Sequence, residues 1–341
     1  MGTILERPKG PSPGGRRVTR TLCALTTLSI ARPGKRSRLD HELEEFYELG
    51  EKLIMPIWKY LAGTRLLYIV PHKDLHRIPF HALKVDRDGR NVHLCEAFEI
   101  MYLPSASVLK FCQERNPHRH GRFAIEHPLV LGTWAEGDGE DCMTSFQSEM
   151  MEVSGLLGSQ AVQGLAAHKG KFLECVSRHD LTHLTCHGYF FNSADVMSSC
   201  GLLLNDGKKY AVKPDKKRFS QTIESDSFVS AKELLKLRLR CHLVTLSGCE
   251  TGLSESMAGD ELLGLSRALL YAGTPSVLLS LWPVHSGSKA ALVSSFYRIW
   301  LSGMGKGKAK TLQEAQMELL SSDRYDSVYH WGGYCMIGDW L

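Results

Sequence analysis

The chain has 341 residues, of which 43% are hydrophobic and 23% are charged, and its net charge is +4. This composition is ordinary for a globular protein with a sizeable core, and the length predicts one large or two ordinary domains. The small net charge does not indicate nucleic acid or a membrane surface as a partner, and no apolar run approaches the roughly 18 residues that a membrane span requires. The ten scattered cysteines include no C-x-x-C pair, which is typical of reduced thiols and favours a cytoplasmic location.

The first 38 residues differ in composition from the rest. They combine Pro and Gly with nine basic residues and a single acid, Glu6. We interpret residues 1–38 as a disordered basic tail, with a transit peptide and a weak signal peptide near 21–31 as the alternatives. Because Thr26 and Thr27 interrupt the apolar run of that signal, we do not expect secretion.

Residues 39–125 are expected to form an N-terminal part with a helix and a few strands. Apolar residues recur at helical spacing over 39–61, and Pro56 should kink that helix or start a new one. In chain order, the further expected elements are a strand at 66–70, a turn-rich connection at 71–83, a strand at 98–103, a helix from Ser105 to about 113, and a polar linker at 114–127.

Residues 126–341 alternate regularly between strand-like and helix-like patterns. We expect strands at 129–132, 181–186, 243–247 and 277–282, and helices at 146–157, 169–178, 260–272, 288–301 and 311–320. Alternation of this kind predicts an α/β fold with a parallel sheet flanked by helices. The polar stretch 206–230 is expected to be a long surface loop, either a gating segment or a tolerated insertion.

Two strand-like runs end on residues that can support nucleophilic chemistry. The run 181–186 is followed by His187 and Gly188, and the run 243–247 is followed by Gly248 and Cys249. Neighbouring parallel strands would bring these residues to one edge of the sheet, where an imidazole can hold a thiol in its reactive thiolate form. The pattern therefore predicts a Cys-His dyad, with the amides of Gly188 and Cys249 as an oxyanion hole. The alternative is that both are core residues, because a buried free cysteine is usually inert.

Other polar groups favour structural interpretations. His183, Cys186 and His187 are close in sequence, but residues 183 and 186 would face opposite sides of a strand, so we expect no metal site. The Gly-Asp-Gly at 137–139 does not match a phosphate-binding loop, and no cofactor is expected. Asp260 opens a predicted helix, where the helix dipole favours an acid whether or not the residue binds substrate.

Four ordered motifs carry a resemblance to a known family. These are YIVPHKDLHRIPFHAL at 68–83, LTHLTCHGYF around His187, LSGCETGLSE around Cys249 with the following GDELLGLSRALLYAGTPSVLLSLWPV, and the closing YHWGGYCMIGDW. Together they resemble a CHAT domain over roughly 43–341, a family of caspase-like cysteine peptidases distantly related to separases. The resemblance implies a caspase-like α/β/α sandwich with a mostly parallel central sheet, in which 39–125 is a candidate pseudo-peptidase half and 126–341 is the catalytic part.

The resemblance also implies an activity and residue roles. It makes the chain a cysteine endopeptidase with His187 as the general base or imidazolium partner and Cys249 as the nucleophile, although LSGCE replaces the Q-A-C-x-G signature of caspases. Ser247, Glu250 and Asp260 are the expected pocket residues. Because related peptidases often carry an acid at the position of Ser247 to bind a basic P1 side chain, we expect a neutral or apolar P1 residue.

The implied partners are a protein substrate and an unknown activator. Some relatives in defence systems activate pore-forming gasdermin-like proteins, so a gasdermin-like or other cell-death protein is the expected substrate by analogy. Relatives are commonly fused to tetratricopeptide repeats that sense a partner. Two alternatives remain open: a catalytically silent CHAT scaffold that binds a peptide or partner protein in the same cleft, and a thiol hydrolase or transferase that acts on small molecules.

Overall fold

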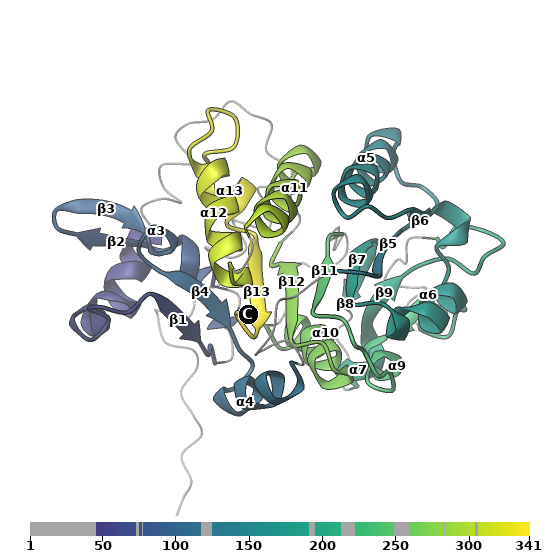
Figure 1. Ribbon diagram of the computed structural model, residues 1–341, viewed down its shortest axis with the longest axis horizontal. Helices are drawn as coiled ribbons and strands as arrows, with labels where there is room; N and C mark the ends of the chain where they lie inside the picture. Colours follow the sequence, from purple (N-terminus) through teal and green to yellow (C-terminus); the bar gives the residue numbers. More distant parts are fainter. Residues whose placement is uncertain are drawn as a thin grey trace, which may run out of the picture.

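The fold is built on an eight-stranded, mostly parallel sheet (Figure 1). The computed structural model describes residues 46–72, 75–76, 78–116, 125–190, 195–212, 222–248, 259–282, 284–303 and 306–341. In spatial order the sheet consists of β1 (Leu66–Ile69), β4 (Glu99–Tyr102), β13 (Tyr334–Gly338), β12 (Ser276–Ser280), β11 (Leu243–Leu246), β7 (Leu181–Thr185), β5 (Pro128–Gly132) and β6 (Ala161–Gln163).

The β12–β13 pair is the one antiparallel junction among the described pairs of this sheet. The strands from β12 to β6 share one direction, and β1, β4 and β13 run the other way. The N-terminal part and the C-terminal strand therefore complete the same sheet as the strands that lead to His187 and Cys249. This confirms the predicted α/β fold.

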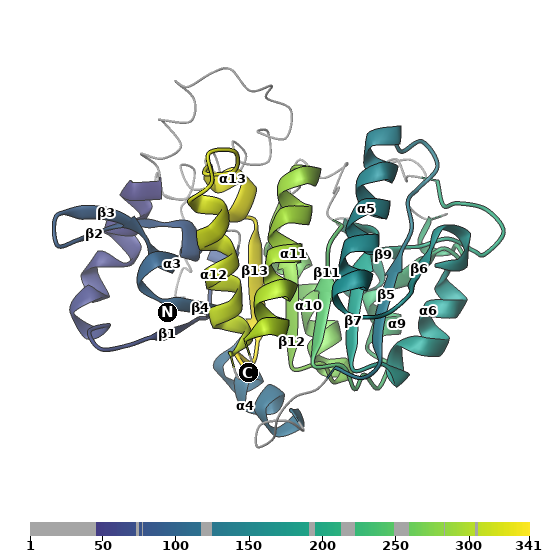
Figure 2. The same ribbon diagram turned by 45° about the horizontal axis from the view of Figure 1, so that its top comes forward.

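Helices cover both faces of this sheet. α5 (Glu140–Leu156), α11 (Ser286–Ser302) and α12 (Lys308–Leu320) lie together on one face, and α4 (Ala106–Arg115) and α10 (Gly259–Ala272) lie on the other (Figures 1 and 2). The shorter helices are α3 (Leu94–Ala97), α6 (Lys169–Cys175), α7 (Val196–Ser199), α9 (Ala231–Leu234), α13 (Val328–Trp331) and the 3-10 turns η2 (Met55–Tyr60), η4 (Phe80–Ala82), η5 (Gly164–Ala166) and η6 (Val176–Arg178). None of the described helices is long and apolar enough to cross a bilayer.

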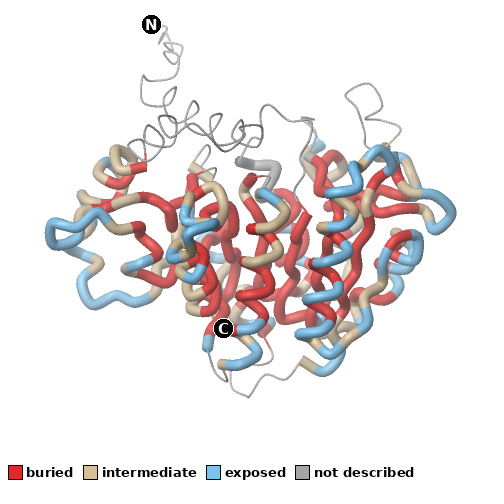
Figure 3. The backbone as a smooth tube through the Cα atoms, turned by 90° about the horizontal axis from the view of Figure 1, so that it is seen from above, coloured by how far each residue is buried: buried red, intermediate tan, exposed pale blue. Residues whose placement is uncertain are grey.

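The strands form the core, as their continuous apolar runs predict. Every residue of β7, β11, β12 and β13 is buried, and buried residues run through the middle of the molecule (Figure 3). Parallel strands covered on both faces have this property because neither face meets water.

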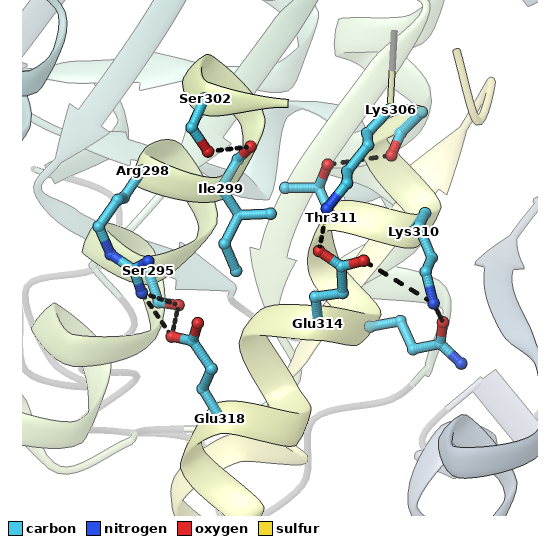
Figure 4. Close-up of polar contacts among 11 residues, drawn as sticks. Ser295, Arg298, Ile299, Ser302, Lys306, Lys310, Thr311, Glu314 and Glu318 are labelled. Carbon is cyan, nitrogen blue, oxygen red and sulfur yellow. Dashed lines mark hydrogen bonds and ion pairs between the residues drawn. The ribbon is translucent and has the colours of Figure 1, made fainter. Parts of the chain in front are cut away.

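On the outer surface, Arg298 and Ser295 of α11 contact Glu318 of α12, and Lys306 and Lys310 contact Glu314 (Figure 4). Exposed pairs of this kind contribute little to stability, so buried apolar contacts hold these helices in place.

The structure departs from the predicted elements in several places. A hairpin, β2 (Lys84–Arg87) and β3 (Arg90–His93), was not predicted, although its Asp88-Gly89 turn has the positive φ values of 54° and 79° that favour this dipeptide. α5 begins at Glu140, six residues earlier than predicted. The predicted tail at 1–38 and most of the predicted linker, 117–124, lie outside the described residues.

The predicted loop 206–230 is partly regular structure. Its last residues form β10 (Phe228–Ser230), which pairs with β9 (Cys200–Leu203), and β9 pairs with β8 (His187–Phe190) in a second, antiparallel sheet. Phe228 and Val229 are fully buried, so this apolar pair anchors the end of the otherwise polar stretch in the protein interior. The middle of the stretch, 213–221, lies outside the described residues.

Two buried histidines near the hairpin predict sensitivity to acid. The His81 imidazole contacts the Tyr102 hydroxyl at 2.8 Å and the Gly332 carbonyl at 2.9 Å, and His93 contacts the Ala82 carbonyl at 2.7 Å. Burial lowers the pKa of each to about 4, although the carbonyl contacts act in the opposite direction. Between pH 6.5 and 4 the unfolded chain therefore binds more protons than the folded one, and stability falls as the pH falls through this range.

We expect each of these histidines to remove about 2 kcal/mol from the free energy of unfolding between pH 7 and pH 5. Urea unfolding of wild type and His93→Gln at both pH values measures this loss, since glutamine can still donate to the Ala82 carbonyl but does not titrate. A His93→Gln protein with the same loss as wild type between the two pH values would contradict the assignment.

Candidate active site

Three neighbouring strands end at one level of the sheet, and the segments that follow them carry Asp138, His187 and Gly248. β5, β7 and β11 are adjacent, with Leu184 of β7 in register with Leu131 of β5 and Leu246 of β11. Beyond these ends come the loop with Asp138, then His187, and then Gly248. The predicted juxtaposition of the two strand ends is therefore present, but Cys249 itself lies outside the described residues.

The ends of β7 and β11 approach each other so closely that only glycine fits at position 248. The Ser247 amide donates to the Leu184 carbonyl at 2.8 Å, and the Gly188 amide donates to the Gly248 carbonyl at 3.2 Å. A Cβ atom on Gly248 would lie 1.8 Å from the carbonyl oxygen of Cys186. Gly248, the residue directly before Cys249, is thus fixed against residues 186–188.

The His187 imidazole is oriented by a carboxylate. Its Nε2 atom lies 2.8 Å from Oδ2 of Asp138, and the two side chains are 1% and 0% exposed. A carboxylate only accepts hydrogen bonds, so Nε2 carries the proton and Nδ1 is the basic nitrogen of the neutral ring. Nδ1 is buried and has no hydrogen-bond partner among the described residues. The contact with Asp138 therefore leaves Nδ1, the basic nitrogen, without a hydrogen bond to any described residue.

Local structure fixes the position of Asp138. The Ala135 amide donates to Oδ2 of Asp138 at 2.7 Å, and the Asp138 amide donates to the Ala135 carbonyl at 3.1 Å. This small turn begins three residues beyond the end of β5. The His187 ring also has two aromatic neighbours, with ring centres 5.5 Å away for Phe146 and 6.2 Å away for Tyr189. The pair is therefore held in a dry setting, where an ionic hydrogen bond is stronger than in water.

A second buried polar network lies behind the strand ends. Glu149 of α5 contacts His183 Nε2 at 3.1 Å and the Lys289 ammonium of α11 at 3.1 Å, and all three side chains are at least 93% buried. Burial alone would raise the pKa of Glu149, but Lys289 and His183 outweigh it and lower that pKa to about 2. The Lys289 ammonium also donates to the Ser247 carbonyl at 3.1 Å and lies 4.4 Å from the Phe146 ring centre. This network therefore supports both the His187 side and the Gly248 side of the site.

The structure places the remaining expected site residues as follows. Ser247 is fully buried, and its hydroxyl lies 3.4 Å from the Tyr334 hydroxyl, so it does not line an open pocket among the described residues. Glu250 lies outside the described residues, and Asp260 lies in the first turn of α10 with a side chain that is not described. The Gly188 amide, expected in an oxyanion hole, is engaged by the Gly248 carbonyl.

Asp138, Glu149 and Lys289 were not identified from the sequence. The signal for Asp138 was weak, because its Gly-Asp-Gly loop comes after a predicted strand but Asp138 lies six residues beyond the end of that strand, whereas His187 directly follows its own. The charged pair carries no comparable signal, since Glu149 and Lys289 are 140 positions apart on two helices and each alone is typical of a solvated helix surface.

The histidine cluster considered as a metal set is not assembled. His183 contacts Glu149 and the Tyr297 hydroxyl beneath the strand ends, whereas His187 contacts Asp138. A different set is assembled instead. One donor atom from each of Asp138, Cys142 and His187 lies within 4.8 Å of the other two.

Comparison with known proteins places this arrangement in a family. The model of the CHAT domain family matches residues 44–339. The chain belongs to the CHAT domain family. This CHAT protein is 28% identical over 304 residues to mouse tetratricopeptide repeat protein 28 and 27% identical to the human protein of that name. The matches cover 80% of this chain but only 12% of each relative's length.

A solved structure of a separase shows the same fold. The CHAT protein superposes on the Saccharomyces cerevisiae separase–securin complex with a TM-score of 0.50 and 16% identity, over 89% of this chain and 17% of that chain. The Arg-specific cysteine proteinase gingipain R matches with a TM-score of 0.48 and 10% identity, over 95% of this chain and 74% of that chain. The separase match and the eight-stranded, mostly parallel sheet together confirm the expected caspase-like fold.

Proposed function

We propose that this CHAT protein is a cysteine endopeptidase in which Cys249 is the nucleophile, His187 the acid and base, and Asp138 the residue that positions His187. The observation that carries this proposal is the alignment of three adjacent strand ends that bear Asp138, His187 and Gly248, with Cys249 next in the chain. A chain that had kept the fold only for binding would have no need of a buried carboxylate–imidazole pair at that edge.

The geometry supports a two-step reaction. Nδ1 of His187 takes the Cys249 proton, the thiolate attacks the scissile carbonyl carbon, and the imidazolium then gives that proton to the leaving amine. Water, deprotonated by His187, next attacks the thioester and releases the new carboxyl end together with the regenerated thiol. Through Nε2–H, Asp138 stabilises the imidazolium that forms in each step.

The oxyanion needs two amide donors, for which Gly188 and Cys249 are the candidates. Because the Gly188 amide donates to the Gly248 carbonyl, substrate binding has to replace this bond with one to the scissile carbonyl oxygen. That bond is 3.2 Å long, at the upper end of the normal range.

A protein substrate and a protein activator fit this proposal. The separase of the matched structure is held in a complex with securin, and the matched relatives are named for tetratricopeptide repeats. By analogy we propose a protein substrate, with a gasdermin-like or other cell-death protein as the candidate and a neutral or apolar P1 residue. Cleavage mainly after Arg or Lys would contradict the P1 preference.

A catalytically silent scaffold is the second candidate. The observation that favours it is the same Gly188–Gly248 hydrogen bond, because an oxyanion donor occupied by the protein's own carbonyl cannot stabilise a tetrahedral intermediate. In that case the edge of the sheet binds a peptide without cutting it.

Sequencing of new protein N-termini separates the two candidates. We expect wild-type protein added to a cell lysate to generate new N-termini with a common residue before the cut, and Cys249→Ala to generate none, because it lacks the nucleophile. Cys175→Ser is the matched control and should behave as wild type, since Cys175 lies on α6, outside the residues that surround His187. Identical N-termini from wild type and Cys249→Ala would refute the peptidase.

A further inference from the structure

The cluster next to the His187–Asp138 pair contains a third donor that the proposed peptidase reaction does not use. Cys142 lies in the first turn of α5, is partly exposed and is not in a disulfide. Its sulfur, a carboxylate oxygen of Asp138 and a ring nitrogen of His187 lie within 4.8 Å of one another. We propose that Asp138, Cys142 and His187 form a binding site for Zn²⁺, and that the bound ion switches the peptidase off. Only the inhibitory effect rests on the proposed function, whereas the metal site does not.

The donor types select a borderline-soft divalent ion. One thiolate, one imidazole and one carboxylate are the ligands that zinc takes in proteins, whereas Ca²⁺ and Mg²⁺ require several oxygen ligands. A thiolate and a carboxylate together carry two negative charges, which neutralise a divalent cation. Three protein ligands leave a fourth position for water, unlike structural zinc sites, which four protein ligands close.

The geometry requires the donor atoms, which lie within 4.8 Å of one another, to move by about an ångström or less. Zinc bonds of about 2.0 to 2.3 Å in a tetrahedron place the donor atoms roughly 3 to 4 Å apart. Asp138 Oδ2 and His187 Nε2 are 2.8 Å apart, so they must separate by a few tenths of an ångström when the metal replaces the Nε2 proton. Because Cys142 is partly exposed while His187 is buried, the ion can enter from the Cys142 side.

The proposed inhibition follows from which atoms the metal takes. Zinc on Nε2 removes the hydrogen bond through which Asp138 positions the imidazole, and it withdraws the carboxylate charge that stabilises the imidazolium. His187 can then no longer accept a proton at Nδ1 without placing a second positive charge beside the ion. The same two side chains thus serve the reaction without metal and block it with metal.

Cobalt binding tests the site without reference to activity. The metal-free full-length Cys249→Ala protein, in which the predicted nucleophile cannot supply the thiolate, is titrated with Co²⁺. We expect one equivalent to give tetrahedral d–d bands and a thiolate-to-cobalt charge-transfer band, both abolished by Zn²⁺. Cys142→Ser in this background should lose the charge-transfer band and bind at least about tenfold more weakly. The control Cys175→Ser should change neither, and a charge-transfer band that survives Cys142→Ser would overturn the site.

Inhibition is tested separately in proteins that retain Cys249. For each protein, the amount of lysate protein cleaved in the presence of Zn²⁺ is divided by the amount cleaved without metal. A chelator should restore the activity of the zinc-inhibited wild type. We expect wild type to lose at least about tenfold and Cys142→Ser to need at least about tenfold more Zn²⁺ for the same loss. Equal zinc sensitivity of the two proteins, or activation by zinc, would overturn the inhibitory role. If no protein cleaves anything while the cobalt bands behave as expected, the peptidase fails and the metal site stands.

Discussion

Asp138→Asn should reduce kcat/KM for a cleaved substrate by roughly 10²- to 10⁴-fold while the protein stays folded. The asparagine oxygen can accept the hydrogen bonds that Oδ2 now accepts from His187 Nε2 and from the Ala135 amide, so the local turn is retained. What is lost is the negative charge that stabilises the imidazolium, in a site where both side chains are at most 1% exposed. The measurement is steady-state cleavage of a peptide that spans a site identified by N-terminal sequencing.

The rate of thiol alkylation distinguishes a loss of charge beside His187 from misfolding. Iodoacetamide reacts with the thiolate form of a cysteine, so Asp138→Asn should label Cys249 more slowly than wild type at neutral pH while the thermal unfolding curves coincide. Asp141→Asn is the matched control, since Asp141 is an acid of the same α5 N-terminus with an exposed side chain. An Asp138→Asn protein with wild-type kcat/KM would show that Asp138 is structural and would leave a two-residue dyad.

Continuous apolar runs made the sheet predictable from the sequence. The runs 181–186 and 243–247 contain the buried strands β7 and β11, because parallel strands covered on both faces bury every position, including the polar Thr182, His183 and Thr185. The hairpin β2–β3 escaped prediction because its strands are short and half exposed, so their hydrophobic pattern is weak. Only the Asp88-Gly89 turn marked it.

The candidate site could be predicted only where its residues directly follow strands. His187 and Gly248 are each the first polar or glycine residue after such a run, and the register of β7 against β11 brings them together. Asp138 lies six residues beyond β5, in a loop whose return path depends on the hydrogen bond between the Glu136 amide and the Ala211 carbonyl. No local pattern specifies a contact between segments 75 positions apart, so the carboxylate that completes the site became visible only in the fold.

Lys289→Met should lower the free energy of unfolding by about 3 to 5 kcal/mol at pH 7. Methionine fills a similar volume, but the Glu149 carboxylate stays fully buried and loses its ion pair with Lys289. Of the two ion-pair partners, only His183 remains. In wild type the Glu149 pKa is about 2, below its ordinary value of 4.5, so this group adds stability above pH 4.5 that is lost as the pH falls toward 2. Without Lys289, burial favours the protonated form instead, so the variant should be penalised more at pH 7 than at pH 5.

Urea unfolding of four proteins separates the charge from the other contacts of Lys289. Glu149→Gln keeps an oxygen for His183 and Thr185 but carries no charge, so the double variant Glu149→Gln/Lys289→Met should recover most of the loss. The acid sensitivity of His81 and His93 is common to all four proteins and cancels in these differences. The exposed pair Lys306–Glu314 supplies the control, since Lys306→Met should change stability by at most about 0.5 kcal/mol. If the double variant is as unstable as Lys289→Met, the loss comes from the bond to the Ser247 carbonyl, and Lys289 acts by holding the strand end before Cys249 rather than by neutralising Glu149.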